Sequence, residues 1–354
     1  MGHPKIDNPT PFVFEPLFVA DEEGRPIVAP VVKATFSVSD RGDVKLAEVQ
    51  QAVCFAGKFN TEEEISSYRL EPEIAFTKPS TDIVLLGHAQ PERAGTTTME
   101  VRFEVGSNRQ RARVTGDRIF EKGFFGDRIS KPQPIDKIPL IYERAFGGWD
   151  RTHEKPKHHS CETRNPVGVG FQAKKGTPIP EGPLPNIESL DRPLNSRGGK
   201  STPVGFGFIS PDWKPRVGFV GTYDDAWTES RSPLLPTDFD RRYFNAAAPN
   251  LIAPSYLKGD ELVLVEGTSA APNWQFRLPG IHAPKCLIVT RSRGAVELDT
   301  NLDTVIVDAD AMTVTLTWRA FTTLRDGPLD VSEMRVTCAN APAPAGPVVA
   351  TQPV

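Results

Sequence analysis

Four residues in one short stretch have side chains that commonly bind zinc: His153, His158, His159 and Cys161. Imidazole nitrogens and thiolate sulfurs are good zinc ligands. Their spacing matches no zinc-binding motif, however, and adjacent histidines would point to opposite sides of a strand. Lys155 and Lys157 lie between them and would repel a cation. The sequence therefore predicts a polar surface loop here, and it predicts no metal and no other cofactor.

Two pairs of neighbouring carboxylates could support acid–base chemistry: Asp224 with Asp225, and Asp238 with Asp240. Glycoside hydrolysis needs two carboxyl groups roughly 5–9 Å apart across a cleft, and a sequence does not show that geometry. Asp240 directly precedes Arg241 and Arg242, which is more typical of an ion-paired loop. A hydrolase that uses Asp224 or Asp238 with a distant histidine therefore stays open as an alternative.

Other catalytic and nucleotide-binding patterns are weaker. The chain has no G-x-S-x-G motif, and the isolated His88 and His282 are expected to be hydrogen-bonded packing residues. Gly199-Lys200-Ser201 imitates the end of a Walker A loop, but Leu194 stands where the first glycine belongs. No catalytic residue is assigned, and the expectation is a binding protein, not an enzyme.

Three dense motifs remain that carry no obvious chemistry. They are YERAFGG at Tyr142–Gly148, NPVGVGF at Asn165–Phe171 and LPNIE at Leu184–Glu188. Paired glycines permit positive φ angles or a close approach of another chain, and Asn-Pro begins turns. The motifs are consistent either with a loop scaffold or with a rigid docking surface.

The elements that position these motifs are predicted to be strands. Apolar and polar residues alternate over 32–38, 99–105 and 313–318, which places each apolar set on one face of a sheet. Asp308-Ala309-Asp310 follows one such run and predicts a hairpin. Only a short helix, within Thr61–Leu70, is expected. The fold class is mainly β, with packed antiparallel sheets, sandwich-like, around a loop-rich centre.

Proline distribution sets the expected domain organisation. The chain has 354 residues and 34 prolines, many of them between Lys131 and Asp260, where they disfavour helices and central strands. We expect a single domain over residues 1–338. Its alternative is two β lobes, about 1–125 and 260–338, joined by a loop-rich middle at 126–259. The Ala/Pro/Val-rich tail at 339–354 is expected to be disordered.

Charge and cysteine usage limit the partners. The net charge is −4, so no global basic surface favours nucleic acid. Arg109, Arg111 and Arg113 have strand spacing and are expected to share one solvated face. The four cysteines are expected to be reduced. No secretory leader or membrane-spanning run is visible, so we expect a cytoplasmic protein that does not bind membranes.

The motifs resemble those of a bacterial family long catalogued as a domain of unknown function and described as type VI secretion adaptor–chaperones. Further matching segments are GTYDDAW, PLLPTDFDRRYFNAA, KGDELVL, FRLPG and LDTVIVDADAMTVTLTWRA, and together they cover most of residues 33–320. One departure is Val169, where an arginine is expected more often. The family is encoded beside effectors with PAAR spike-tip domains and beside the valine-glycine-repeat spike protein.

The resemblance implies an adaptor that binds an effector near its PAAR-containing region and loads it onto the spike, and the spike protein is a second possible partner. Binding by an apolar groove and by strand addition to a sheet edge both stay open, as does the oligomeric state. The expected partner-binding residues come from the motifs: Tyr142, Glu143, Arg144, Phe146, Gly147, Gly148, Asn165, Pro166, Gly168, Gly170, Phe171, Tyr223, Asp224, Trp227, Asp238, Phe239 and Asp240. A carbohydrate-binding β-domain that uses Trp213 and Trp227 is a third alternative.

Overall fold

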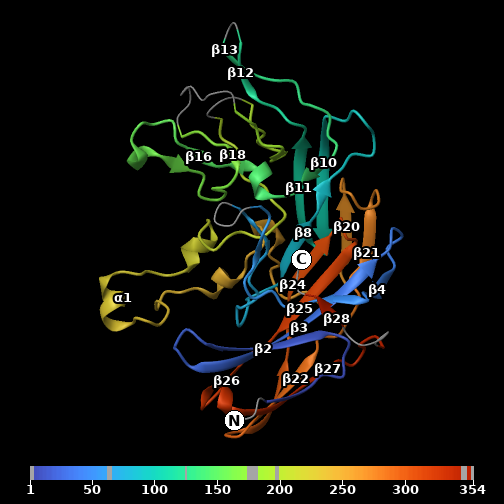
Figure 1. Ribbon diagram of the computed structural model, residues 1–354, viewed down its shortest axis with the longest axis vertical. Helices are drawn as coiled ribbons and strands as arrows, with labels where there is room; N and C mark the ends of the chain where they lie inside the picture. The colour runs from blue at the N-terminus through green and yellow to red at the C-terminus, as the bar shows by residue number, and fades with distance from the viewer. Residues whose placement is uncertain are drawn as a thin grey trace.

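The fold is mainly β, as the alternation of apolar and polar residues predicts. The computed structural model describes residues 4–61, 66–123, 126–173, 182–195, 199–343 and 349–351. Three large sheets dominate it (Figure 1). Within the described residues the one α-helix is α1, Asp225–Ser230, and the other helical segments are short 3-10 turns. The expected fold class is confirmed.

The largest sheet combines strands from both ends of the chain. Its main order is β2-β3-β25-β24-β8, and β4 and β26 also pair with β3. Neighbours are antiparallel except β24 and β8, which run in parallel. The bounds are β2 Val13–Ala20, β3 Pro26–Val38, β4 Val44–Leu46, β8 Asp82–Leu86, β24 Asn301–Asp308, β25 Thr313–Arg319 and β26 Thr322–Thr323. The expected hairpin is confirmed, because β24 and β25 are joined through Ala309–Met312.

Two further sheets flank this one (Figure 1). The first has the order β19-β11-β10-β20-β21, and the second has the order β1-β27-β22-β23. The first comprises β10 Thr98–Val105, β11 Asn108–Thr115, β19 Ile187–Glu188, β20 Leu262–Glu266 and β21 Trp274–Arg277. The second comprises β1 Lys5–Asp7, β22 Lys285–Thr290, β23 Gly294–Asp299 and β27 Val331–Thr337. Segments from both flanks of the sequence therefore lie side by side in all three sheets.

The arginine run lies where its spacing predicts. Arg109 and Arg111 alternate with buried Gln110 and Ala112 along β11, so they share one exposed face. Arg111 makes a two-point ion pair with Glu100 of the neighbouring strand, with Nε–Oε1 and Nη2–Oε2 distances of 2.5 and 3.0 Å. This pairing offsets part of the positive charge of the face.

A group of charged side chains is buried on the face of the largest sheet that carries Lys33. Lys33 of β3 is fully buried, and its Nζ lies 2.6 Å from Oε2 of Glu73. Arg319 of β25 pairs with Asp303 of β24 at 2.7 Å, and Lys78 pairs with Asp82 of β8 at 2.7 Å. We call these residues, with Glu71 and Arg216, the buried charge network. Because each of these charges lies next to an opposite charge, other segments of the polypeptide can cover this face of the sheet and exclude water from it.

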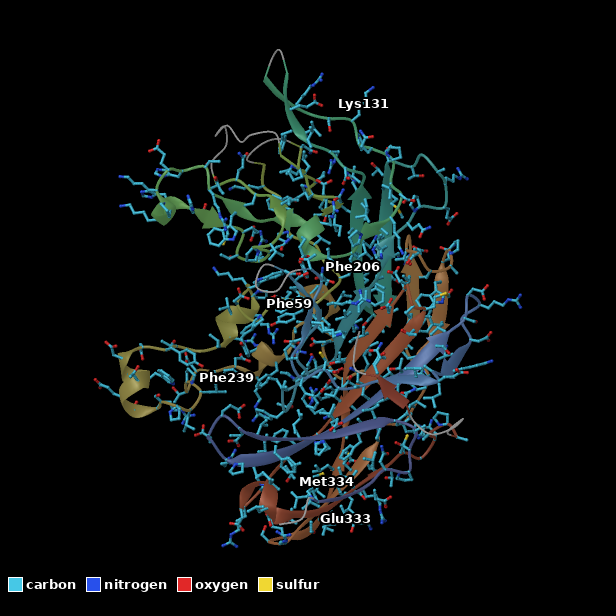
Figure 2. The ribbon with its side chains drawn as sticks, in the orientation of Figure 1. Phe59, Lys131, Phe206, Phe239, Glu333 and Met334 are labelled. Carbon is cyan, nitrogen blue, oxygen red and sulfur yellow. The ribbon has the colours of Figure 1, made fainter. Side chains whose placement is uncertain are left out.

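Between Lys131 and Asp260 the described residues form loops, 3-10 turns, two-residue strands and the helix α1. The segment over residues 220–240 carries α1 and extends away from the sheets. We call this segment the arm. Figure 1 shows the arm extending sideways from the sheets, and Figure 2 shows Phe239 on it, away from buried Phe206. The prolines thus coincide with a region of ordered turns.

The expected helix and the expected disordered tail fall partly outside the described residues. In the segment expected to hold a short helix, residues 62–65 are not described, and Tyr68–Leu70 form strand β7, so a helix over the whole segment is wrong. In the tail expected to be disordered, 344–348 and 352–354 are not described, and β28 (Val349–Thr351) pairs in parallel with β5 (Val49–Gln51). The described part of the chain contains no helix that is long and apolar enough to cross a membrane, and its four cysteines are unpaired.

Replacing Lys33 should destabilise the protein strongly. Lys33→Met leaves Glu73 without its cation in a buried site, and such a loss costs about 3–5 kcal/mol of unfolding free energy. Urea unfolding followed by tryptophan fluorescence measures it. Lys285→Met is the matched control, because Lys285 pairs with Glu297 and Asp299 on an exposed surface and should cost less than about 1 kcal/mol. Equal losses in the two variants would contradict a sealed network.

The same variant should change how stability depends on pH. Burial is the largest single effect and would raise the pKa of Glu73. The charge and hydrogen bond of Lys33, the Cys54 amide and the Arg319 charge together outweigh it, so the pKa lies below its usual range. In the wild type the pair therefore stabilises the fold above the unfolded pKa of glutamate and is lost as pH falls through the lowered value. Without Lys33, burial raises the pKa of Glu73. The stability gap between wild type and Lys33→Met should therefore shrink as pH falls from neutral to acidic, and a constant gap would contradict the assignment.

Candidate docking surface

The three dense motifs come together in space and form one loop assembly, which we call the platform. β15 (Phe146–Gly147) pairs in parallel with β18 (Val169–Gly170). Ala145 forms a bridge with Ile187, and the Asn186 amide donates to the Arg144 carbonyl at 2.8 Å. In the sequence these motifs share only their density and their lack of obvious chemistry. The structure shows that they pack on one another.

Asn165 holds the platform together from inside. Its side chain is completely buried, and Nδ2 donates to the carbonyls of Tyr142 at 2.9 Å and Phe146 at 3.0 Å. Its backbone carbonyl accepts from the backbone N–H of Gly148 at 2.8 Å. The side-chain amide thus gives the Phe146 carbonyl a donor and gives the Tyr142 carbonyl a second donor beside the Ala145 N–H, as a regular sheet would do for its own carbonyls.

Glycine at position 148 is required by the close approach of two chains. Gly148 has a φ of +91°, and a Cβ there would lie 2.2 Å from the Gly168 carbonyl oxygen. A Cβ on Gly168 would lie 2.6 Å from the Ala145 carbonyl oxygen. The glycine pairs of the two motifs therefore permit the loops to contact each other.

Most side chains of the platform face inward. Tyr142 and Phe146 are buried, and Tyr142 packs edge-on against Trp213 with ring centroids 5.3 Å apart. Burial raises the pKa of the Tyr142 phenol well above its ordinary value. Phe171 is half-buried beside Phe146, at 6.5 Å. Pro166, Gly170 and Gly147 are likewise half-buried or buried, so these residues serve packing.

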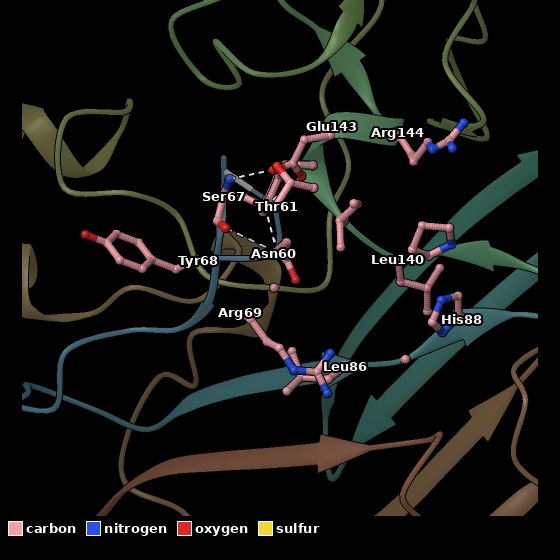
Figure 3. Close-up of a pocket in the computed structure, with 15 residues that line it drawn as sticks. Asn60, Thr61, Ser67, Tyr68, Arg69, Leu86, His88, Leu140, Glu143 and Arg144 are labelled. Atoms are coloured by element: carbon pink, nitrogen blue, oxygen red, sulfur yellow. Dashed lines mark hydrogen bonds between the residues drawn. The ribbon is translucent and has the colours of Figure 1, made fainter. Parts of the chain in front are cut away.

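A pocket of about 360 Å³, lined by both polar and apolar residues, lies beside the platform (Figure 3). Glu143 accepts hydrogen bonds from the Ser66 hydroxyl at 2.7 Å and the Ser67 amide at 2.6 Å, and His88 Nδ1 lies 2.6 Å from Asp310. Arg144 is exposed and lies 3.7 Å from Asp117. The charged groups of this pocket are thus already paired. His88 is the hydrogen-bonded residue that the sequence analysis expected.

The carboxylates of the second group of motifs cap turns on the arm. Asp224 accepts from the Trp227 amide at 2.8 Å and begins α1. Asp238 accepts from the amide and hydroxyl of Thr222 at 2.9 and 2.7 Å, which lowers its pKa. Asp240 pairs with Arg242 at 2.6 Å, and this bond lowers its pKa. Each carboxylate therefore has a local structural partner, and the ion-paired loop expected at Asp240 is observed.

The aromatic residues of the arm differ in exposure. Tyr223 is 49% exposed and packs edge-on against Trp227 at 4.6 Å. The Trp227 indole donates to the Leu234 carbonyl at 2.9 Å, and this hydrogen bond joins α1 to the segment that follows it. Phe239 packs against Phe244 at 5.4 Å, at the base of the arm. Trp213, considered above for sugar stacking, is buried.

The arm is attached to the turn between β2 and β3. Arg231 Nη1 lies 2.9 Å from Glu23, and Arg241 Nε lies 2.5 Å from Glu22. Gly24 in the same turn has a φ of +73°, and a Cβ there would lie 2.6 Å from Leu234. We call this set of contacts the latch, because it connects two segments about 210 residues apart in sequence.

An apolar groove of about 580 Å³ runs between the latch and the body. Three segments line it: the end of β2 with its turn, residues 71–76, and the arm at Pro233–Leu235. Tyr68, Arg216, Tyr243 and Phe244 line it as well. Tyr68 lines both this groove and the pocket of Figure 3, where its ring extends away from the other labelled residues.

The histidine cluster forms an exposed turn. The rings of His153 and His158 lie 4.4 Å apart, and His159 Nε2 lies 2.9 Å from the His153 carbonyl. Cys161 lies in the adjoining strand β17, Ser160–Cys161. Among the described residues, no group of three or more acidic, histidine or cysteine side chains is arranged to hold a metal ion.

The chain is matched over residues 23–319 by the model of a family described as "uncharacterized protein conserved in bacteria (DUF2169)". The protein belongs to this family. The match spans the platform, the arm and most of the three sheets, and it ends at the last residue of β25. No curated protein and no solved structure matches the chain.

The sequence motifs mark residues of the platform and the arm, but they give no indication of the groove. Val19 and Ile74 line it and are 36% and 53% exposed. Neither lies in a motif, and they come from segments some 50 residues apart. The one available signal was Leu234-Leu235 between two prolines, an apolar pair in a region that cannot form a central strand.

Asn165 gives a direct test of the platform. Asn165→Asp replaces the amide donor by an acceptor that faces two carbonyls, and we expect a loss of about 3 kcal/mol in unfolding free energy. Chemical unfolding and the rate of proteolytic cleavage within 142–171 measure it. Asn301→Asp makes the same change at an exposed site where the side chain has no hydrogen bond to the described residues, and it should alter stability by less than about 0.5 kcal/mol. A stable, protease-resistant Asn165→Asp variant would show that the two carbonyl contacts are dispensable.

Proposed function

We propose that this protein is an adaptor–chaperone of type VI secretion. It binds an effector near its PAAR-containing region in the cytoplasm and presents it to the secretion spike. The resemblance of the motifs suggests this role, and one observation carries it: an exposed, aromatic-bearing arm frames an apolar groove on an otherwise well-packed β body. Exposed apolar surface of this kind is typical of protein interaction sites.

Residue chemistry supports binding more than catalysis. Asp224 and Asp238, on which a hydrolase would depend, accept hydrogen bonds from amides of their own turns. The most exposed aromatic residue of the arm is Tyr223, a residue type enriched at interface hot spots. The platform contributes rigidity next to the arm, which limits the entropy lost on docking.

Complex formation with the neighbouring PAAR-bearing effector tests the proposal. The two proteins are coexpressed, and co-purification, light scattering and the soluble fraction of the effector are measured. We expect a complex and a higher soluble yield of the effector. Failure of two correctly folded proteins to associate would refute effector binding.

A pair of variants locates the contact. Tyr223→Ala should reduce effector affinity about tenfold, because a central aromatic contact contributes about 1–2 kcal/mol. Trp149→Ala is the matched comparison, since Trp149 is also 49% exposed but lies beside the platform. It should change affinity by less than about twofold. The reverse pattern would move the docking site from the arm to the platform.

A further inference from the structure

We propose that the groove beside the arm binds an uncharged, apolar segment of the partner polypeptide, and that it does so through side chains and not by strand addition. This inference rests on the adaptor function proposed above and adds the chemistry of the bound segment. Its basis is the lining of the groove, the pairing of every charge around it and the state of the sheet edges.

The walls offer apolar surface without a cover. Ile74 is 53% exposed and Val19 is 36% exposed, and both line the groove. Leu234 and Leu235 on the arm are half-buried and form the opposite wall. Burial of such side chains is favourable at about 25 cal/mol per Å², so a segment that covers them gains affinity from apolar contact.

The charges around the groove are already neutralised. In the turn, Asp21 pairs with Arg25 at 2.7 Å, and the latch pairs Glu22 and Glu23 with Arg241 and Arg231. At the floor, Arg216 pairs with Glu71 and donates to the Tyr243 carbonyl at 2.8 Å. A charged side chain that entered this groove would lose its hydration and find no free counter-charge. Because the groove offers no free counter-charge, charge complementarity favours a partner segment without charged side chains.

Hydrogen bonding in the groove favours side-chain recognition. Pro72, Pro211 and Pro233 line it and have no backbone N–H to offer. Tyr68 and Tyr243 also line it, and neither hydroxyl has a hydrogen-bond partner among the described residues. Two hydroxyls are enough to pair with isolated carbonyls of an extended segment, but they do not provide the continuous ladder that an added strand needs.

Three edge strands of the large sheets are poorly suited to accept another strand. Edge strand β2 contains Pro16, which removes one ladder donor. Edge strand β8 already gives its Leu85 amide to the Phe206 carbonyl at 3.0 Å. Edge strand β23 carries Glu297 and Asp299, charges that discourage pairing. Of the two binding modes left open by the sequence, the groove is the one that the structure favours.

The test uses the full chain and the effector encoded beside it. Overlapping synthetic peptides that cover the effector are immobilised and probed with the wild-type protein, and the affinity of a binding peptide is measured by fluorescence anisotropy at low and high salt. We expect the bound peptides to be apolar and uncharged, with little weakening at high salt. Ile74→Glu and Leu235→Glu should each weaken binding at least about tenfold.

Leu329→Glu is the matched control, because Leu329 is 54% exposed on a different part of the surface; it should bind like the wild type, and circular dichroism should show that all variants are folded. If the whole effector co-purifies equally with Ile74→Glu and wild type, or if the bound peptides are charged, the groove inference is overturned while the adaptor function stands. If the effector does not bind wild type, both proposals fail.

Discussion

A lysine buried beneath the middle of a sheet is the constraint on which this fold depends. Lys33 is fully enclosed, so its charge can persist only if Glu73 is brought against it. Arg319 with Asp303, and Lys78 with Asp82, impose the same requirement nearby. The strand β3 is consequently buried on both faces, and the segment from 71 to 82 is fixed over it instead of running freely in solvent.

That network also reaches the groove. Glu71 lies 4.0 Å from Lys78 and pairs with Arg216, which belongs to the loop-rich centre of the chain. Burial raises the pKa of Glu71, whereas Arg216 and Lys78 lower it, and burial prevails. The floor of the groove is therefore an extension of the charged core. Its position is determined by buried ion pairs, and its rim is determined by the exposed pairs of the latch, which are individually weak.

The sequence predicted regular features well and long-range ones poorly. Alternation over 32–38 and 313–318 identified β3 and β25, and the 308–310 turn identified the hairpin before β25. The same alternation places Lys33 on the face opposite the apolar set but does not show that this face is buried, because its partner Glu73 lies 40 residues away. The platform motifs were recognisable because their glycines and Asn165 are locally unusual. The groove was not, since its walls are ordinary apolar residues from three separate segments.

The order of strands in the largest sheet has a consequence for biosynthesis. β25 is synthesised about 280 residues after its neighbour β3, and β8 must wait for β24. Non-local pairing of this kind makes folding slow and leaves unsatisfied strand edges on the nascent chain. A molecule proposed to bind another polypeptide would itself expose unpaired strand edges until β24 and β25 have been synthesised.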